Sequence, residues 1–138
     1  MAARFPRWKP PEFDERGMTQ WNWMCQHPEH LRVGKGSDVG AFTYINAKFG
    51  VDIGEDAQIG SHCSLYSVST IDDKKGPIVI GRGARLGAHS VVMPGVTIGE
   101  GAVVGAFSFV TRDVPAGATA FGIPAKVVRK ARSRDELP

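Results

Sequence analysis

The chain has 138 residues, of which 42% are hydrophobic and 22% charged, and its formal net charge is +3. This length fits one domain with one core, and the charge is too small to indicate a nucleic-acid partner. No apolar run is long enough to span a bilayer, and the first residues lack the apolar stretch of a signal peptide. We therefore expect a cytoplasmic protein without membrane insertion.

The first thirty residues show no regular period. Residues 1–12 contain three prolines and should form an extended arm. Residues 13–30 should form a short helix or an irregular cap over the core that follows, because stacked strands leave an apolar end and unpaired backbone groups. Trp21 and Trp23 seal that end in this interpretation, and stacking on a ligand is the alternative.

From residue 33 onward an aliphatic residue recurs at every sixth position, with a small residue four positions later and glycine usually next to the aliphatic. Neither the helical period of 3.6 nor the strand period of 2 produces this pattern. Short strands separated by corners do, since three hexapeptides close one triangular coil with the aliphatic side chain inside. The sequence thus predicts an all-β parallel β-helix of four or more coils. The aliphatic positions are Val33, Val39, Ile45, Ile53, Ile59, Leu65, Ile71, Ile80, Leu86, Val92, Ile98, Val104 and Val110.

The repeat is interrupted twice. A two-residue slip between Ile45 and Ile53 predicts a small bulge. After Ile71, the charged insert DDKKGP predicts a loop over residues 72–79 that leaves the prism. Cys63 falls on an inward small position and should be a reduced packing residue, because two cysteines do not make a disulfide framework.

The C-terminal segment carries many basic residues, and Pro115 and Pro124 break its pattern. We expect a final partial coil and then a short helix beginning near Ala125. The predicted organisation is an arm and cap over 1–30, the β-helix with its loop over 31–121, and a basic segment with the helix over 122–138.

The repeat resembles that of the left-handed β-helix hexapeptide acyltransferases, and within them the branch of galactoside, maltose and other sugar acetyltransferases. The most specific part is PGVTIGEGAVVGAFSFVTRDVPAGATAFGIPAKVVRK, residues 94–130. The resemblance implies a left-handed coil, acetyl-coenzyme A as co-substrate and no metal. It also implies a sugar or nucleotide-sugar acceptor, acetylated on a hydroxyl or amino group, in surface polysaccharide biosynthesis.

The same resemblance suggests where coenzyme A binds. Thr111 and Arg112 match the family's cofactor-lining pattern, and the basic C-terminal residues would supply cations for the phosphates; a merely solvated basic tail is the alternative. Backbone amides near two corners are expected to hold the thioester oxygen or the pantetheine amides. The expected cofactor-binding residues are Gly87, Ala88, Gly105, Ala106, Thr111, Arg112, Lys126, Arg129 and Lys130.

The proton-transfer chemistry needs an outward side chain, because the prism interior is filled. His62 and His89 each follow an inward aliphatic residue by three positions and should project outward. An imidazole titrates near neutral pH and can take the proton of an attacking hydroxyl or amine. In the family the loop carries a catalytic histidine. Here the loop contains no histidine, and Asp72 and Asp73 lie close to the position that the family's histidine would occupy.

We rank His62 first as the base, because it matches a position that lines the acceptor site in the sugar branch. Asp72 is an alternative, and so is His89, which matches a common non-catalytic histidine of that branch. For either histidine, a plain surface or interface role is also open. The expected acceptor-binding residues are Tyr44, Asn46 and Asp73.

Other functions of the same fold were weighed. The γ-class carbonic anhydrases bind zinc through histidines that include an H-x4-H pair. If His89 began such a pair, the second ligand would fall at Pro94, which cannot bind a metal. A non-catalytic scaffold or assembly subunit is the other alternative, because the loop lacks the family's histidine.

An outer face bearing Phe42, Phe107 and Phe109 is more apolar than a soluble monomer usually exposes. A closed three-fold ring of parallel prisms would bury this face and create three equivalent clefts. The sequence therefore predicts a homotrimer with sites between subunits.

Overall fold

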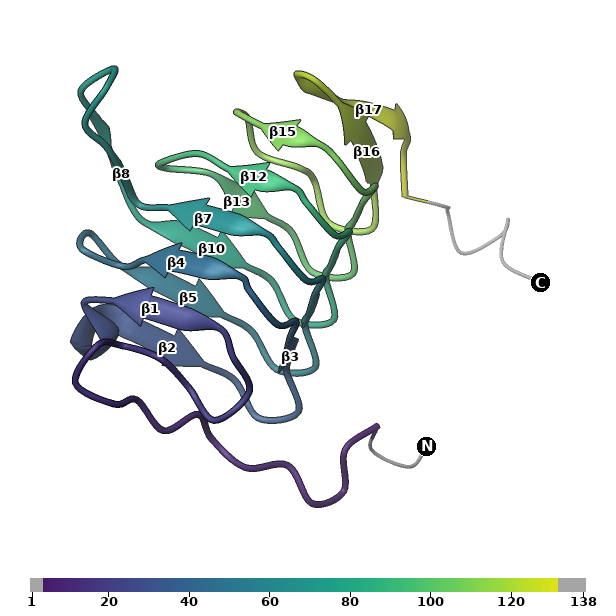
Figure 1. Ribbon diagram of the computed structural model, residues 1–138. Helices are drawn as coiled ribbons and strands as arrows, with labels where there is room; N and C mark the ends of the chain where they lie inside the picture. Colours follow the sequence, from purple (N-terminus) through teal and green to yellow (C-terminus); the bar gives the residue numbers. More distant parts are fainter. Residues whose placement is uncertain (1–3, 132–138) are drawn as a thin grey trace.

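The computed structural model describes residues 4–131, whose regular structure is β apart from one 3-10 turn, Pro28–His30 (Figure 1). Short strands follow one another around a prism and stack into coils along its length, with the described ends of the chain at opposite ends of the stack (Figure 1). The expected all-β parallel β-helix is confirmed. No helix in the described chain is long and apolar enough to cross a membrane.

Three parallel sheets form the faces of the prism, and each coil adds one strand to a sheet. Pairing keeps equivalent hexapeptide positions above one another, so that Ile45 lies between Cys25 and Leu65. The strands of the first face are β1 (Met24–Gln26), β4 (Tyr44–Asn46), β7 (Ser64–Tyr66), β12 (Val91–Val92) and β15 (Phe109–Val110); of the second, β2 (Leu31–Val33), β5 (Val51–Ile53), β10 (Ile78–Ile80) and β13 (Thr97–Ile98); of the third, β3 (Asp38–Val39), β6 (Gln58–Ile59), β11 (Arg85–Leu86), β14 (Val103–Val104) and β16 (Thr119–Gly122).

The repeated aliphatic side chains form the core, as the six-residue period predicts. All of them are buried except Val33, at the open end of the prism, and Ile71. The small residues four positions later are buried too, apart from Ser69, and three of their hydroxyls, those of Thr43, Ser90 and Ser108, donate to corner carbonyls. Thr43 Oγ1 donates to the Gly60 carbonyl at 2.9 Å, and Ser108 Oγ to the Gly105 carbonyl at 2.7 Å.

The placement of Ile71 inside the prism is wrong. The chain leaves the coil after Ser67 and forms an antiparallel hairpin of β8 (Val68–Ser69) and β9 (Lys74–Lys75), with Ile71 fully exposed at its turn. The hairpin projects from one corner of the prism (Figure 1). It begins earlier than the predicted loop, because Ile78 and Ile80 of β10 already fill this level of the core.

The segment expected to cap the core contains no α-helix. Residues 13–19 form a tight turn, and β1 extends the first sheet with Cys25 pointing inward. Trp23 is buried at the end of the prism and meets Phe13 edge-to-face, with 5.7 Å between ring centroids. Trp23 therefore seals the core end as predicted, whereas Trp21 is 43% exposed.

The short C-terminal helix expected from Ala125 is wrong. The chain instead turns at Ile123 and Pro124 and returns as β17 (Ala125–Arg129), antiparallel to β16. Val127 and Val128 favour this extended conformation, and β17 covers the edge that β16 would otherwise leave unpaired. Lys126 and Arg129 are consequently carried on a strand, and residues 132–138 lie outside the described chain.

Close contact between successive coils requires glycine at the corners. A Cβ atom added to Gly81 would lie 2.5 Å from the backbone nitrogen of Glu100 in the next coil. Gly83, two residues later, needs glycine for a different reason, since it has a φ of +66° but open space around its Cα.

We expect Gly81→Ala to lower the free energy of unfolding by about 1–3 kcal/mol, because the added methyl group must push two coils apart. Thermal and denaturant unfolding of purified protein measure this. Gly83→Asn is the matched control, because asparagine tolerates a left-handed φ and meets no neighbour there. Equal stability of Gly81→Ala and the unmodified chain would refute the close-contact argument.

Candidate active site

One corner of the prism carries a column of stacked rings. Phe42, His62, His89 and Phe107 occupy the same hexapeptide position in successive coils, and all four side chains are exposed. The ring centroids of His62 and His89 are 4.6 Å apart with an interplanar angle of 7°. His89 and Phe107 are 4.9 Å apart at 2°, and Phe42 and His62 are 5.1 Å apart at 40°. We call these four residues the ring ladder.

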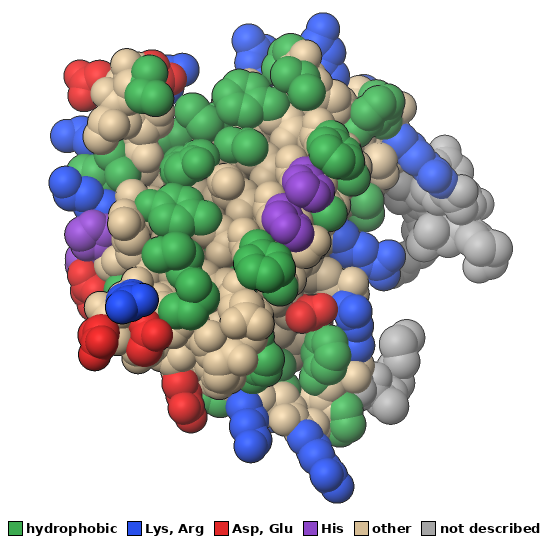
Figure 2. Space-filling view, viewed as in Figure 1, with side chains coloured by type: hydrophobic (Ala, Val, Ile, Leu, Met, Phe, Trp, Pro, Cys, Tyr) green, Lys and Arg blue, Asp and Glu red, His purple; other side chains and the backbone are tan. Residues whose placement is uncertain are grey.

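The coil repeat accounts for the ladder's spacing. Parallel strands stack at about 4.8 Å, which is close to the distance at which flat rings make contact. Figure 2 shows adjacent histidine side chains on this face, with hydrophobic side chains on both sides of them. The two histidines are thus brought together as outward side chains, in agreement with their predicted orientation.

All ladder residues have left-handed backbone conformation, with φ between 57° and 66°. This region costs energy for residues with a Cβ, and phenylalanine adopts it rarely. Hydrogen bonds between coils hold the conformation in place: the N–H of His89 donates to the Ser61 carbonyl at 3.0 Å, and that of Phe107 to the Ala88 carbonyl at 3.0 Å. The corner therefore fixes the direction of each ring.

The expected backbone donors lie beside this ladder. Ala88 immediately precedes His89, and Ala106 immediately precedes Phe107. Gly87 and Gly105 use their N–H groups to bond the next coil. The N–H groups of Ala88 and Ala106 donate to no acceptor within residues 4–131; their role towards a carbonyl oxygen stays a prediction.

The predicted acceptor-binding residues Tyr44 and Asn46 lie on the outward side of β4, on the face next to the ladder. The Tyr44 hydroxyl donates to Gln26 Oε1 at 2.8 Å, and the amide of Asn46 lies 3.4 Å from the same atom. Burial raises the pKa of the Tyr44 phenol, so it stays a neutral hydrogen-bond donor near neutral pH. Tyr66 packs beside it, with 5.7 Å between centroids.

Asp72 and Asp73 lie on the β8–β9 hairpin and are exposed. A hydrogen bond from Ser69 chiefly lowers the pKa of Asp72, helped by Lys74, whose Nζ is 3.6 Å from its carboxylate. A carboxylate that holds its proton less tightly is a poorer general base at neutral pH. The lowered pKa of Asp72 therefore argues against it as the general base.

The predicted cofactor cations are exposed. Arg112 and Thr111 follow β15 directly, Lys126 and Arg129 lie on β17, and Lys130 follows that strand. Within residues 4–131 no hydrogen bond joins them to the ring ladder, and their role stays a prediction. They gather in the last coils, toward the end of the prism away from the N-terminus (Figure 1).

Two features of the site escaped sequence reasoning. Phe42 and Phe107 were assigned only to an outer apolar face, although they share the third position after the inward aliphatic with both histidines. That shared position was the available signal. Gln26 was missed because the six-residue period does not extend into β1, so nothing in the sequence aligned it with Asn46.

Among residues 4–131, no three histidine, cysteine, aspartate or glutamate side chains are grouped so that they could hold a metal ion.

The comparisons with known proteins agree with this geometry. The model of the bacterial transferase hexapeptide (six repeats) matches residues 77–112. The chain is 41% identical over 117 residues to nodulation protein L of Rhizobium meliloti, covering 72% of this chain and 63% of that protein. It is 32% identical over 130 residues to galactoside O-acetyltransferase of Escherichia coli, covering 83% and 64% respectively. The chain thus spans just under two thirds of these relatives.

Solved structures show the same fold. A hexapeptide-repeat acetyltransferase of Vibrio cholerae, complexed with acetyl-coenzyme A, is 28% identical, with a TM-score of 0.76 over 80% of this chain and 66% of that one. A galactoside acetyltransferase in complex with coenzyme A is 28% identical, with a TM-score of 0.74 over 83% and 61%.

The chain therefore carries the repeat of the hexapeptide transferase family, and several of the proteins that it resembles are named acetyltransferases. Within that family, its resemblance to the sugar acetyltransferases is confirmed by sequence and by fold.

Proposed function

We propose that this protein is a coenzyme A-dependent acyltransferase that moves an acetyl group onto a hydroxyl or amino group of a sugar or nucleotide-sugar. One observation carries the proposal: a proton acceptor, His62, is stacked in a ladder beside backbone N–H groups that have no internal acceptor. A base and oxyanion donors at one corner are the parts that acyl transfer requires. The coenzyme A complexes of similar proteins support the choice of donor.

The reaction needs two proton transfers, one to His62 from the acceptor hydroxyl and one from His62 to the leaving thiolate. His62 takes the proton of the acceptor hydroxyl as its oxygen attacks the thioester carbonyl carbon. The N–H groups of Ala88 or Ala106 stabilise the oxyanion that forms. The carbon–sulfur bond then breaks, and the coenzyme A thiolate receives the proton from His62. His89 and Phe42 keep the imidazole of His62 in one orientation by packing on its two faces.

Coenzyme A is proposed to lie along the corner, with its thioester near the ladder and its phosphates toward the last coils. Arg112, Lys126, Arg129 and Lys130 are exposed there and offer cations to the phosphates. Tyr44 and Asn46 lie on the neighbouring face. The Tyr44 hydroxyl donates its one hydrogen to Gln26 Oε1, so its oxygen is left to accept a hydrogen bond from a sugar hydroxyl. Asp73, on the hairpin, is proposed as a further acceptor contact.

We place this reaction in the cytoplasm and in the synthesis of surface polysaccharide. The two cysteines support a reducing compartment, since Cys25 and Cys63 are both buried and free. Burial raises the pKa of Cys25 to about 12, so its thiol is unreactive at neutral pH. The galactoside acceptor named for one relative supports a sugar substrate. A screen of sugars and nucleotide-sugars with acetyl-coenzyme A, followed by thiol release, tests the whole proposal.

The homotrimer is part of this proposal. Phe42 and Phe107 are each 65% exposed, and an open corner alone cannot enclose a substrate. Packing a second prism against the corner would bury these rings and create the cleft.

We expect static light scattering at micromolar concentration to give three times the monomer mass of 14.9 kDa. Because ring burial supplies the association energy, Phe42→Asp combined with Phe107→Asp should shift the mass toward the monomer. Ile71→Asp, an exposed apolar change away from the ladder, is the control. A stable monomer of the unmodified chain would contradict both the trimer and the interfacial cleft.

We expect His62→Ala to lower kcat by about 10²–10⁴-fold while coenzyme A affinity and oligomeric mass stay unchanged, because a general base acts only in the chemical step. Steady-state kinetics by thiol release measure the loss. Asp72→Asn, His89→Ala and His62→Ala are compared in parallel. If His62→Ala keeps full activity and another variant loses it, that residue is the base. If all three stay active, the acceptor is an amine and the enzyme works by positioning both substrates.

The double variant Arg129→Ala with Lys130→Ala should raise KM for acetyl-coenzyme A by about 5–30-fold with kcat nearly intact. The reason is that each cation contributes about 0.5–1 kcal/mol to phosphate binding at a wet surface. Initial-rate kinetics against acetyl-coenzyme A check this, with Lys35→Ala as an exposed cation remote from the last coils. An unaltered KM would assign the basic segment to solubility.

A further inference from the structure

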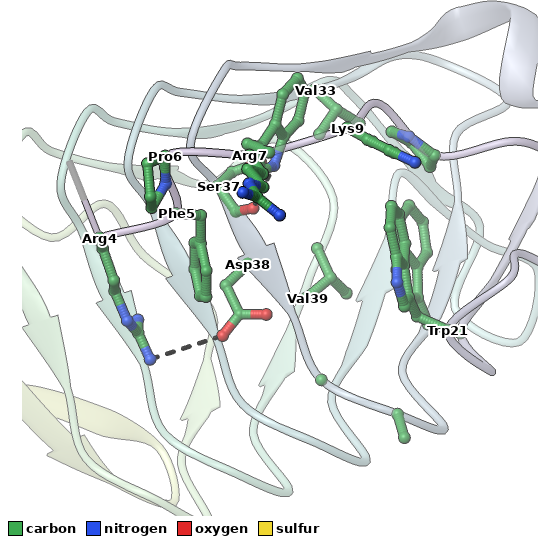
Figure 3. A pocket seen from close by; sticks show the side chains of 15 residues that line it. Arg4, Phe5, Pro6, Arg7, Lys9, Trp21, Val33, Ser37, Asp38 and Val39 are labelled. Carbon is green, nitrogen blue, oxygen red and sulfur yellow. Dashed lines mark hydrogen bonds and ion pairs between the residues drawn. The ribbon is translucent and has the colours of Figure 1, made fainter.

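A large pocket opens at the other end of the prism, between the N-terminal arm and the first coil. Its volume is about 780 Å³, which is enough for a molecule of nucleotide size. Figure 3 shows Phe5 and Trp21 on opposite sides, with Asp38 and Val39 between them and the arm residue Arg7 above. The Nε1 of Trp8 fastens the arm by donating to the Ser37 carbonyl at 2.8 Å.

The charge of the pocket favours an anion. The arm brings Arg4, Arg7 and Lys9 to its rim, whereas Asp38 is the only carboxylate among the lining residues. Arg4 already pairs with Asp38 at 3.6 Å. Arg7 and Lys9 are exposed and form no ion pair with any residue of the described chain, so two cations are left for a ligand.

The pocket wall also contains an unsatisfied polar atom. Ser37 is 6% exposed, and its Oγ has no hydrogen-bond partner among residues 4–131. A buried hydroxyl without a partner costs about 1–3 kcal/mol. That oxygen has almost no accessible surface, so a ligand in the pocket must be recognised by other groups. Trp21, 43% exposed, offers a flat face on which an aromatic ring can stack.

The pocket adjoins the foot of the ring ladder. Its lining ends at Gly40 and Ala41, and the next residue is Phe42. The N–H of Phe42 donates to the Asn22 carbonyl at 2.6 Å, and Asn22 follows Trp21 in the chain. The N–H of His62 in turn donates to the Ala41 carbonyl at 3.1 Å. The edge of the pocket is therefore hydrogen-bonded to the backbone of the proposed base.

We propose that this pocket binds the nucleoside diphosphate part of a nucleotide-sugar acceptor, and that the sugar extends along the corner to His62. This rests on the proposed function and decides between its two acceptor classes. The base stacks on Trp21, and the diphosphate binds Arg7 and Lys9 through charge-assisted hydrogen bonds. No covalent change occurs in the pocket.

The test is isothermal titration of the full-length protein with UDP, dTDP and GDP, in the presence of saturating coenzyme A. Saturation keeps the diphosphates from binding where coenzyme A binds. We expect at least one of the three to bind, and Arg7→Gln combined with Lys9→Gln to weaken it by about tenfold or more. Trp21→Ala should weaken it as well, and Lys35→Gln, an exposed cation outside the pocket, should not.

Kinetics provide the second readout. The double variant should raise KM for the nucleotide-sugar and leave KM for acetyl-coenzyme A unchanged. Absence of binding by all three diphosphates at millimolar concentration, or equal binding by the variants, overturns the proposal. Binding of laurate in place of the diphosphates overturns it in favour of an alkyl chain. If a diphosphate binds the pocket but coenzyme A does not bind the protein, the proposed transferase function fails while the nucleotide site stands.

Discussion

Hydrogen bonding between successive coils is the constraint on which the rest of this structure depends. Parallel pairing places every sixth-position residue directly above its equivalent in the previous coil, as Ile45 lies above Cys25. The core is consequently a stack of equivalent layers, in which inward aliphatic side chains pack beside small residues. The same pairing forces backbone against backbone at corners such as Gly81, where even a methyl group has no room.

The constraint extends to the surface. A column of inward aliphatic residues necessarily generates a column of outward residues three positions later, and here that column holds two histidines between two phenylalanines. Side chains that would move freely on a loop are held in ring-to-ring contact by the coil spacing. The N–H groups of Ala88 and Ala106, next to this column, have no acceptor among residues 4–131. The regularity of the fold thus places at one corner the histidine and the backbone N–H groups for which we propose catalytic roles.

Insertions interrupt this regularity only at corners. The β8–β9 hairpin leaves one corner without displacing the layers above and below, because β10 rejoins β5 in register. The arm at the N-terminus similarly lies outside the stack and creates a pocket against Val39 without entering the core. In this chain the hairpin carries carboxylates in place of the family's histidine, and the arm carries cations.

The sequence by itself determined the coil, because short strands around a triangular coil account for a period of six with inward Ile, Leu and Val. The same period placed His62 and His89 on the outside. It misjudged Ile71 and the segment after Ala125, and it did not find β1 within the segment expected to cap the core. A position in the repeat does not say whether the chain stays in the prism, and short extended segments have no period of their own. Tertiary structure determined these features. Ile78 and Ile80 occupy the level of the core where Ile71 was expected. The edge of β16 pairs with β17, and β4 pairs with β1. The contact of His62 with His89, and the pocket beside Trp21, likewise exist only once residues distant in the sequence are stacked one coil apart.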